Sequence, residues 1–235
     1  MDTYLAQGLK IDWAAMPTYN TIMAVAAGAG LMSVVGFGRR LWMNREYSAE
    51  GYALSFAILG FILTTTGLHM TLTWPLAAGG FPFDNIIFGE PALAFGVLLL
   101  GASVFLWRRG STITGTDRMA AITVTGGPVS IFVCGMGLAC FGIAAAGIDN
   151  QLFAAPPEEP ISGQFADYPL VEAIFISGLY ALVGIGAVLA PLGLRHRNKL
   201  VLTIIGVVWW LAGLAFFLFG ALNYFTHIGL IVNTM

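Results

Sequence analysis

The sequence predicts an all-α, polytopic membrane protein with six transmembrane helices and with both termini outside. Hydrophobic residues make up 58% of the chain and charged residues only 9%, and the mean hydropathy of +0.84 lies outside the range of soluble domains. Six apolar segments are long enough to cross a hydrocarbon core of about 30 Å, which takes roughly 20 helical residues. The basic residues gather in three clusters between these segments. These observations predict a single transmembrane helical-bundle domain over residues 1–235.

Short polar segments separate the six predicted spans, which run over residues 17–38, 51–74, 88–107, 129–147, 170–194 and 200–225. The fourth span is the least regular, because Gly126, Gly127 and Pro128 interrupt an apolar stretch that begins at Met119. We expect a kink or a short interfacial segment there. The longest connection, residues 148–168, is rich in proline and acidic residues, and we expect it either to fold over the outer face or to be disordered.

The basic clusters give the orientation of the spans. Nine of the ten basic residues lie in the clusters, and short cytoplasmic loops retain lysine and arginine. The clusters are therefore expected in the cytoplasm of a multi-pass protein of the plasma (inner) membrane, with the lipid bilayer as partner and with no nucleic-acid partner. Their members are Arg39, Arg40 and Arg45, then Arg108, Arg109 and Arg118, then Arg195, Arg197 and Lys199.

Polar residues mark the outer ends of five predicted spans. Ionisable residues at membrane depth are costly and usually face the bundle interior with a partner. His69 and Glu90 both lie roughly 27 Å along their helices from the cytoplasmic end, so we expect them to meet as the principal ligands of a metal ion. The supplementary ligands are predicted to be Asp149, Glu172 and His227, and the hydrogen-bonding residues behind them Asn85 and Tyr224.

Several of these residues also have a plainer interpretation. The helix dipole favours a carboxylate at a helix N-terminus, which by itself accounts for Glu90 and Glu172. A histidine at the end of a span is often an interfacial hydrogen-bonding residue, and this applies to His69. His227 reaches the level of the other residues only if its helix tilts or if the chain folds back after it.

Imidazole and carboxylate side chains that converge from several helices suit a transition metal such as Cu, Fe, Mn or Zn. No Glu-x-x-His or His-Glu-x-x-His motif supports a di-iron or zinc-protease site. The aromatic bulk of the helices disfavours haem. The sequence thus predicts a metal or polar cofactor site at the outer helix ends, with a role in a membrane oxidoreductase if the metal is redox-active. Whether the protein is an enzyme stays open.

Two other functions fit the same sequence. A non-catalytic subunit or assembly partner of a larger membrane complex, or a homo-oligomer, would explain the glycine-rich helix faces. A small-molecule transporter is the second alternative. The lack of ionisable residues in the inner half of the spans argues against it, because a path across the membrane normally needs polar groups near the midplane.

Two neighbouring motifs carry a family resemblance. Residues 67–76 read Gly-Leu-His-Met-Thr-Leu-Thr-Trp-Pro-Leu, and residues 85–91 read Asn-Ile-Ile-Phe-Gly-Glu-Pro. Over residues 60–101 the chain resembles domain-of-unknown-function family 981 of bacterial and archaeal membrane proteins. The stretch between the two motifs, residues 77–84, is longer here than in the family pattern. The resemblance implies a polytopic inner-membrane protein and implies no known activity.

Overall fold

The computed structural model describes residues 18–73, 83–110 and 118–235, which form helices joined by turns, without a strand among them. Six helical segments in these ranges are long and apolar enough to cross a membrane. The predicted all-α fold with six spans is confirmed. The helices are α1 (Asn20–Trp42), α2 (Ala49–Thr73), the π-helix η1 (Asn85–Gly89) continued by α4 (Glu90–Arg109), α5 (Arg118–Asp149), α6 (Pro169–His196) and α7 (Lys199–Thr234).

Two helices extend beyond the predicted spans. Helix α5 continues through Pro128 instead of beginning after it, and the Ser130 hydroxyl donates a hydrogen bond to the Gly127 carbonyl at 2.6 Å. Such serine contacts help to satisfy backbone groups near a proline in a membrane helix. Helix α7 runs on to Thr234 instead of ending near 225, because the apolar residues 228–232 continue the helix. Its 36 residues span roughly 54 Å, which exceeds the hydrocarbon thickness.

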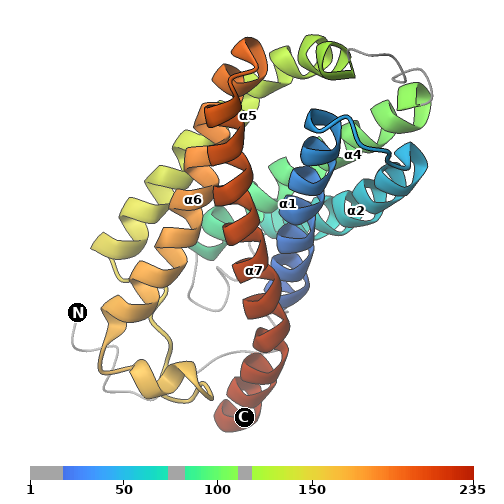
Figure 1. Ribbon diagram of the computed structural model, residues 1–235. Helices are drawn as coiled ribbons and strands as arrows, with labels where there is room; N and C mark the ends of the chain where they lie inside the picture. The colour runs from blue at the N-terminus through green and yellow to red at the C-terminus, as the bar shows by residue number, and fades with distance from the viewer. Residues whose placement is uncertain (1–17, 74–82, 111–117) are drawn as a thin grey trace.

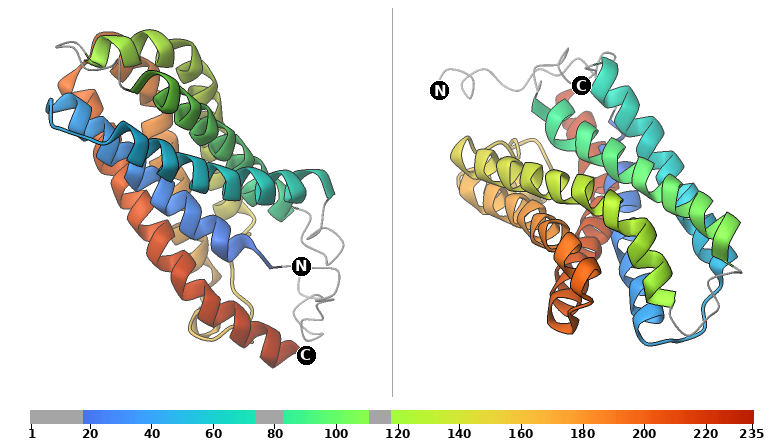
Figure 2. Two further views of the ribbon diagram at one scale, coloured as in Figure 1. Left: turned by 90° about the vertical axis from the view of Figure 1, so that its right-hand side faces the viewer. Right: turned by 90° about the horizontal axis from the view of Figure 1, so that it is seen from above.

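The helices pack as three pairs. Helices α1 and α7 lie side by side through the centre, with the hairpin of α2 and α4 on one side and the hairpin of α5 and α6 on the other (Figures 1 and 2). Glycines allow the central pair to approach closely: a Cβ atom at Gly28 would lie 2.5 Å from the Gly213 carbonyl oxygen. Small residues are what permit such close contact between membrane helices.

The two hairpins meet where η1 lies against α5 and α6. Helices α4 and α5 themselves touch at few points. Ile87 of η1 forms one buried cluster with Cys140 and Ile143 of α5 and with Tyr180 of α6. We call this cluster the seam. It joins the hairpins at one end of the bundle.

Residues 150–168, here called the outer loop, fold against the helices at the same end. The loop contains the short 3-10 helix η3 (Ser162–Phe165). Asn233 of α7 donates a hydrogen bond to the Glu158 carbonyl at 2.7 Å, and Pro160 packs on Gly229 of α7. Of the two sequence expectations for this connection, the structure therefore shows folding over the helix ends.

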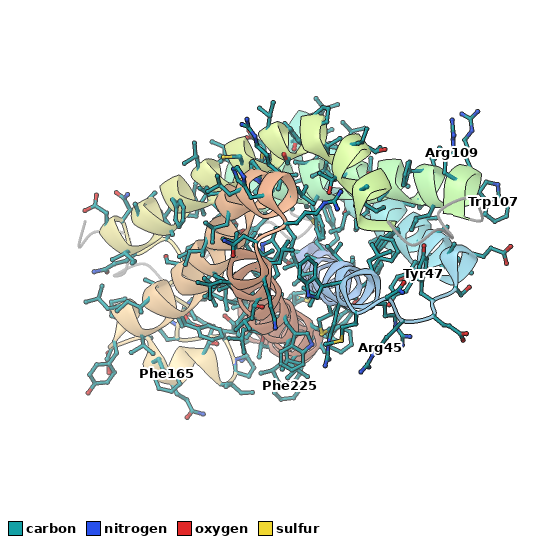
Figure 3. The ribbon with its side chains drawn as sticks, turned by 45° about the horizontal axis from the view of Figure 1, so that its top comes forward. Arg45, Tyr47, Trp107, Arg109, Phe165 and Phe225 are labelled. Atoms are coloured by element: carbon teal, nitrogen blue, oxygen red, sulfur yellow. The ribbon has the colours of Figure 1, made fainter. Side chains whose placement is uncertain are left out.

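The chain begins α1 and ends α7 at the end of the bundle that carries the outer loop (Figure 1). The turns after α1 and α6 lie at the opposite end, seen toward the viewer in Figure 3, where Arg45, Arg109 and Trp107 point away from the ribbon. We call the two ends outer and inner, following the predicted orientation. That the termini face outside, and that the membrane is the plasma membrane, stay predictions.

Candidate functional site

His69 lies near the outer end of α2 with an exposed side chain. Its Nδ1 atom is 2.7 Å from the Tyr19 hydroxyl, and the two rings meet edge to face at 5.6 Å. The pair links the end of α2 to the beginning of α1. The other ring nitrogen, Nε2, has no hydrogen bond to a residue that the structure describes.

Glu90, the first residue of α4, is exposed and lines a groove on the other side of the hairpin. The groove has a volume of about 370 Å³ and lies between η1 and α4 on one side and α5 on the other. The described contacts of His69 are thus with α1, whereas Glu90 faces α5, and no described contact joins the two. Besides Glu90, the lining residues are apolar: Phe83, Ile86, Ile87 and Pro91, then Met136, Ala139, Gly142, Ile143 and Ala146 of α5, and Leu152 of the outer loop.

The structure brings two of the three supplementary residues together, around a carboxyl group that the sequence did not single out. Glu172 accepts a hydrogen bond from the Ala155 amide at 2.6 Å, and His227 contacts the Asn223 carbonyl at 3.0 Å. Glu159 of the outer loop interacts with both.

Burial raises the pKa of Glu159 above its usual range; Thr226 and His227 oppose this rise, and the nearby Glu172 adds to it. Burial of a loop carboxylate depends on how the loop packs, so the local sequence gave no signal for this residue. Asp149, the last residue of α5, is exposed.

The two residues predicted to hydrogen-bond behind the ligands differ in their surroundings. Asn85 is 1% exposed and donates a hydrogen bond to the Met70 carbonyl at 2.7 Å. Met70 lies in the last turn of α2, where carbonyl groups lack helical partners, so Asn85 caps that helix. Tyr224 is 45% exposed on α7.

A second group of polar side chains lies at the seam. The Tyr180 hydroxyl donates a hydrogen bond to the Ile87 carbonyl within the π-helix at 2.5 Å. Tyr180 interacts electrostatically with Asp84, which lies directly before η1, and with Cys140. Burial raises the pKa of Asp84 to about 7. In the sequence, the position of Asp84 directly before an apolar run was the available hint that its carboxyl group is partly buried.

Comparison with family models identifies the wider group. The model described as "Protein of unknown function (DUF981)" matches residues 15–229. The chain belongs to this family. Comparison of this DUF981 protein with curated proteins and with solved structures gives no match. The family match over residues 15–229 confirms the resemblance that the sequence indicated.

Two kinds of ligand can be compared with the described side chains of this DUF981 protein. Among residues 18–73, 83–110 and 118–235, no group of three or more His, Cys, Asp or Glu side chains could hold a metal ion, and this includes Glu159, Glu172 and His227. The metal centre stays a prediction. An apolar groove with a carboxyl group on its wall can instead hold an apolar chain and a polar head together.

Proposed function

We propose that this DUF981 protein binds a membrane-dissolved amphiphile in the groove between η1, α4 and α5. The observation that carries the proposal is that Glu90 is the one ionisable residue among the described lining residues of an otherwise apolar groove. An ionised carboxylate only accepts hydrogen bonds. The matching head group therefore offers hydrogen-bond donors or a positive charge, as an amine does.

The walls of the groove suit the apolar part of such a molecule. Its volume of about 370 Å³ lies within the range of roughly 300–1,000 Å³ typical of ligand pockets. Gly142 leaves room on the α5 wall, since a Cβ atom there would meet nothing within 4 Å. A single acyl or isoprenoid chain can lie along this wall with its head group at Glu90. The site is one-sided, in keeping with the predicted lack of polar groups through the midplane.

Filling the groove tests the proposal. Gly142→Leu adds a side chain to the α5 wall, whereas Gly135→Leu adds the same side chain to an exposed position of α5 that is not a described lining residue and has equally open surroundings. Each protein is reconstituted with equal amounts of phosphatidylethanolamine and phosphatidylglycerol, and the lipid that stays bound is measured by native mass spectrometry. We expect Gly142→Leu to lower the retained phosphatidylethanolamine by about tenfold, which corresponds to about 1.4 kcal/mol. Gly135→Leu should match the parent.

Glu90→Gln distinguishes the contribution of the lipid head group to binding from that of the apolar chain. The amide keeps the size of the side chain but removes the negative charge, so the preference for phosphatidylethanolamine over phosphatidylglycerol should disappear while some lipid remains bound. Equal retention of phosphatidylethanolamine by the parent and by Gly142→Leu would disprove binding in the groove. A preference that survives in Glu90→Gln would disprove the role of the carboxyl group.

A metal at His69 is a second candidate. The observation that favours it is the Tyr19 hydroxyl at Nδ1, which fixes the ring and leaves Nε2 available, as outer-shell groups do for metal-binding histidines. Elemental analysis of purified protein is then expected to find a transition metal, and His69→Ala to lower its content. Unchanged metal content in His69→Ala would remove this candidate.

A further inference from the structure

The outer loop supplies one residue, Leu152, to the described lining of the groove. The lining residues of α5 follow one another toward its outer end, from Met136 to Ala146, and Leu152 comes after the end of the helix. Leu152 therefore covers the outer end of the groove. We infer that Leu152 limits the size of the head group, so that the groove accepts a primary amine in preference to the same amine carrying methyl groups. This inference rests on the proposed function, because it concerns the ligand of the same groove.

The backbone at the end of α5 fixes the position of Leu152. The Leu152 amide donates a hydrogen bond to the Gly147 carbonyl at 3.1 Å. The Gln151 amide donates one to the Ile148 carbonyl at 3.4 Å, and Gln151 is in the left-handed conformation with a φ of 53°. These are the contacts of a Schellman motif, in which the apolar residue after the left-handed one commonly contacts the last turns of its own helix. Leu152 occupies that position, so the cap of α5 also forms a wall of the groove.

The residues that follow hold the same wall from its other side. Phe153 stacks on Tyr180 of α6 with 6.1 Å between the ring centroids, and its ring lies 6.3 Å from that of Phe88 in η1. Two residues further on, the Ala155 amide donates a hydrogen bond to Glu172 of α6 at 2.6 Å. The outer end of the groove is thus held between a helix cap and an aromatic anchor. It cannot give way to a larger ligand without the loss of these contacts.

The carboxylate in the groove allows the size of the head group to be separated from its charge. Glu90 accepts hydrogen bonds, and a primary ammonium group donates them. Monomethyl and dimethyl ammonium groups keep the positive charge and an N–H donor, so the carboxylate can still bind them. What they add is apolar volume at the tip of the head group, in a groove whose outer end is covered. One additional carbon in a fitted pocket changes binding by about tenfold.

Head groups of increasing size test the inference. Each protein is reconstituted with equal amounts of phosphatidylethanolamine and of its N,N-dimethyl derivative with the same acyl chains, and the retained lipids are compared by native mass spectrometry. We expect the parent to retain about tenfold less of the dimethyl lipid. Leu152→Ala removes the wall at the outer end and should bring the two lipids close to equal retention. Leu152→Phe enlarges the wall and should move the ratio of the two lipids in the opposite direction.

Leu170→Ala is the matched control. Leu170 is 48% exposed in the first turn of α6 and is not a described lining residue, so this variant should keep the ratio of the parent. A ratio that is the same in the parent, Leu152→Ala and Leu152→Phe would overturn the inference, as would an equal change in Leu170→Ala. If Gly142→Leu lowers the retained phosphatidylethanolamine while the Leu152 variants leave the ratio unchanged, only this inference is wrong. If Gly142→Leu retains as much as the parent, the proposed function and the inference are both wrong.

Discussion

Tyr180→Ala is expected to lower the free energy of unfolding by about 3–5 kcal/mol, the usual cost of truncating a buried aromatic side chain to alanine. Tyr180 is 6% exposed, stacks on Phe153 of the outer loop at 6.1 Å and meets Phe216 of α7 edge to face at 6.0 Å. Its hydroxyl donates a hydrogen bond to the Ile87 carbonyl. One side chain thus connects α6, α7, η1 and the outer loop.

Tyr180→Phe separates the contribution of the ring from that of the hydroxyl. The ring contacts remain, but the buried Ile87 carbonyl loses its donor, so we expect a smaller loss of about 1–3 kcal/mol. Unfolding of the purified proteins by denaturant in mixed micelles gives both values. Tyr168→Ala serves as the control, because Tyr168 is 66% exposed and its truncation should change stability little. Equal losses in Tyr180→Ala and Tyr168→Ala would contradict the central position of Tyr180.

The depth of polar residues along the spans could be predicted from the sequence, because rise per residue and membrane thickness fix it. The rotation of each helix about its own axis could not, since it depends on which neighbour the helix packs against. His69 and Glu90 illustrate this difference. Both lie at the outer end as predicted, but His69 contacts Tyr19 of α1, whereas Glu90 lines the groove toward α5.

The two acidic residues that the sequence did not predict as site residues share one property. Asp84 and Glu159 lie outside the apolar spans, where a carboxyl group is ordinarily assumed to be hydrated. Each interacts with residues that are distant in sequence: Asp84 with Tyr180 of α6, and Glu159 with Glu172 of α6 and with Thr226 and His227 of α7. Local hydropathy carries no information on such packing. The last turns of α7 also contact distant chain, since Asn233 and Gly229 pack against the outer loop.

Gly28→Ala is expected to destabilise the bundle by about 1–3 kcal/mol through overpacking. A Cβ atom at this position would collide with the Phe217 amide nitrogen and would lie 2.5 Å from the Gly213 carbonyl oxygen. These are backbone atoms of α7, so no side chain can turn aside and the two central helices must move apart. Both hairpins pack against this pair, so the displacement reaches the whole bundle.

Gly38→Ala provides the matched comparison within α1. A Cβ atom at Gly38 would meet nothing within 4 Å, and alanine in place of a helical glycine is ordinarily favourable by about 0.5–1 kcal/mol. The two substitutions are chemically identical, so their difference in unfolding midpoint isolates the contact between α1 and α7. We expect Gly38→Ala to unfold at the same or a higher denaturant concentration than the parent, and Gly28→Ala at a lower one. A Gly28→Ala protein as stable as Gly38→Ala would show that α1 and α7 do not pack this closely, and would remove the central pair on which the arrangement of the two hairpins depends.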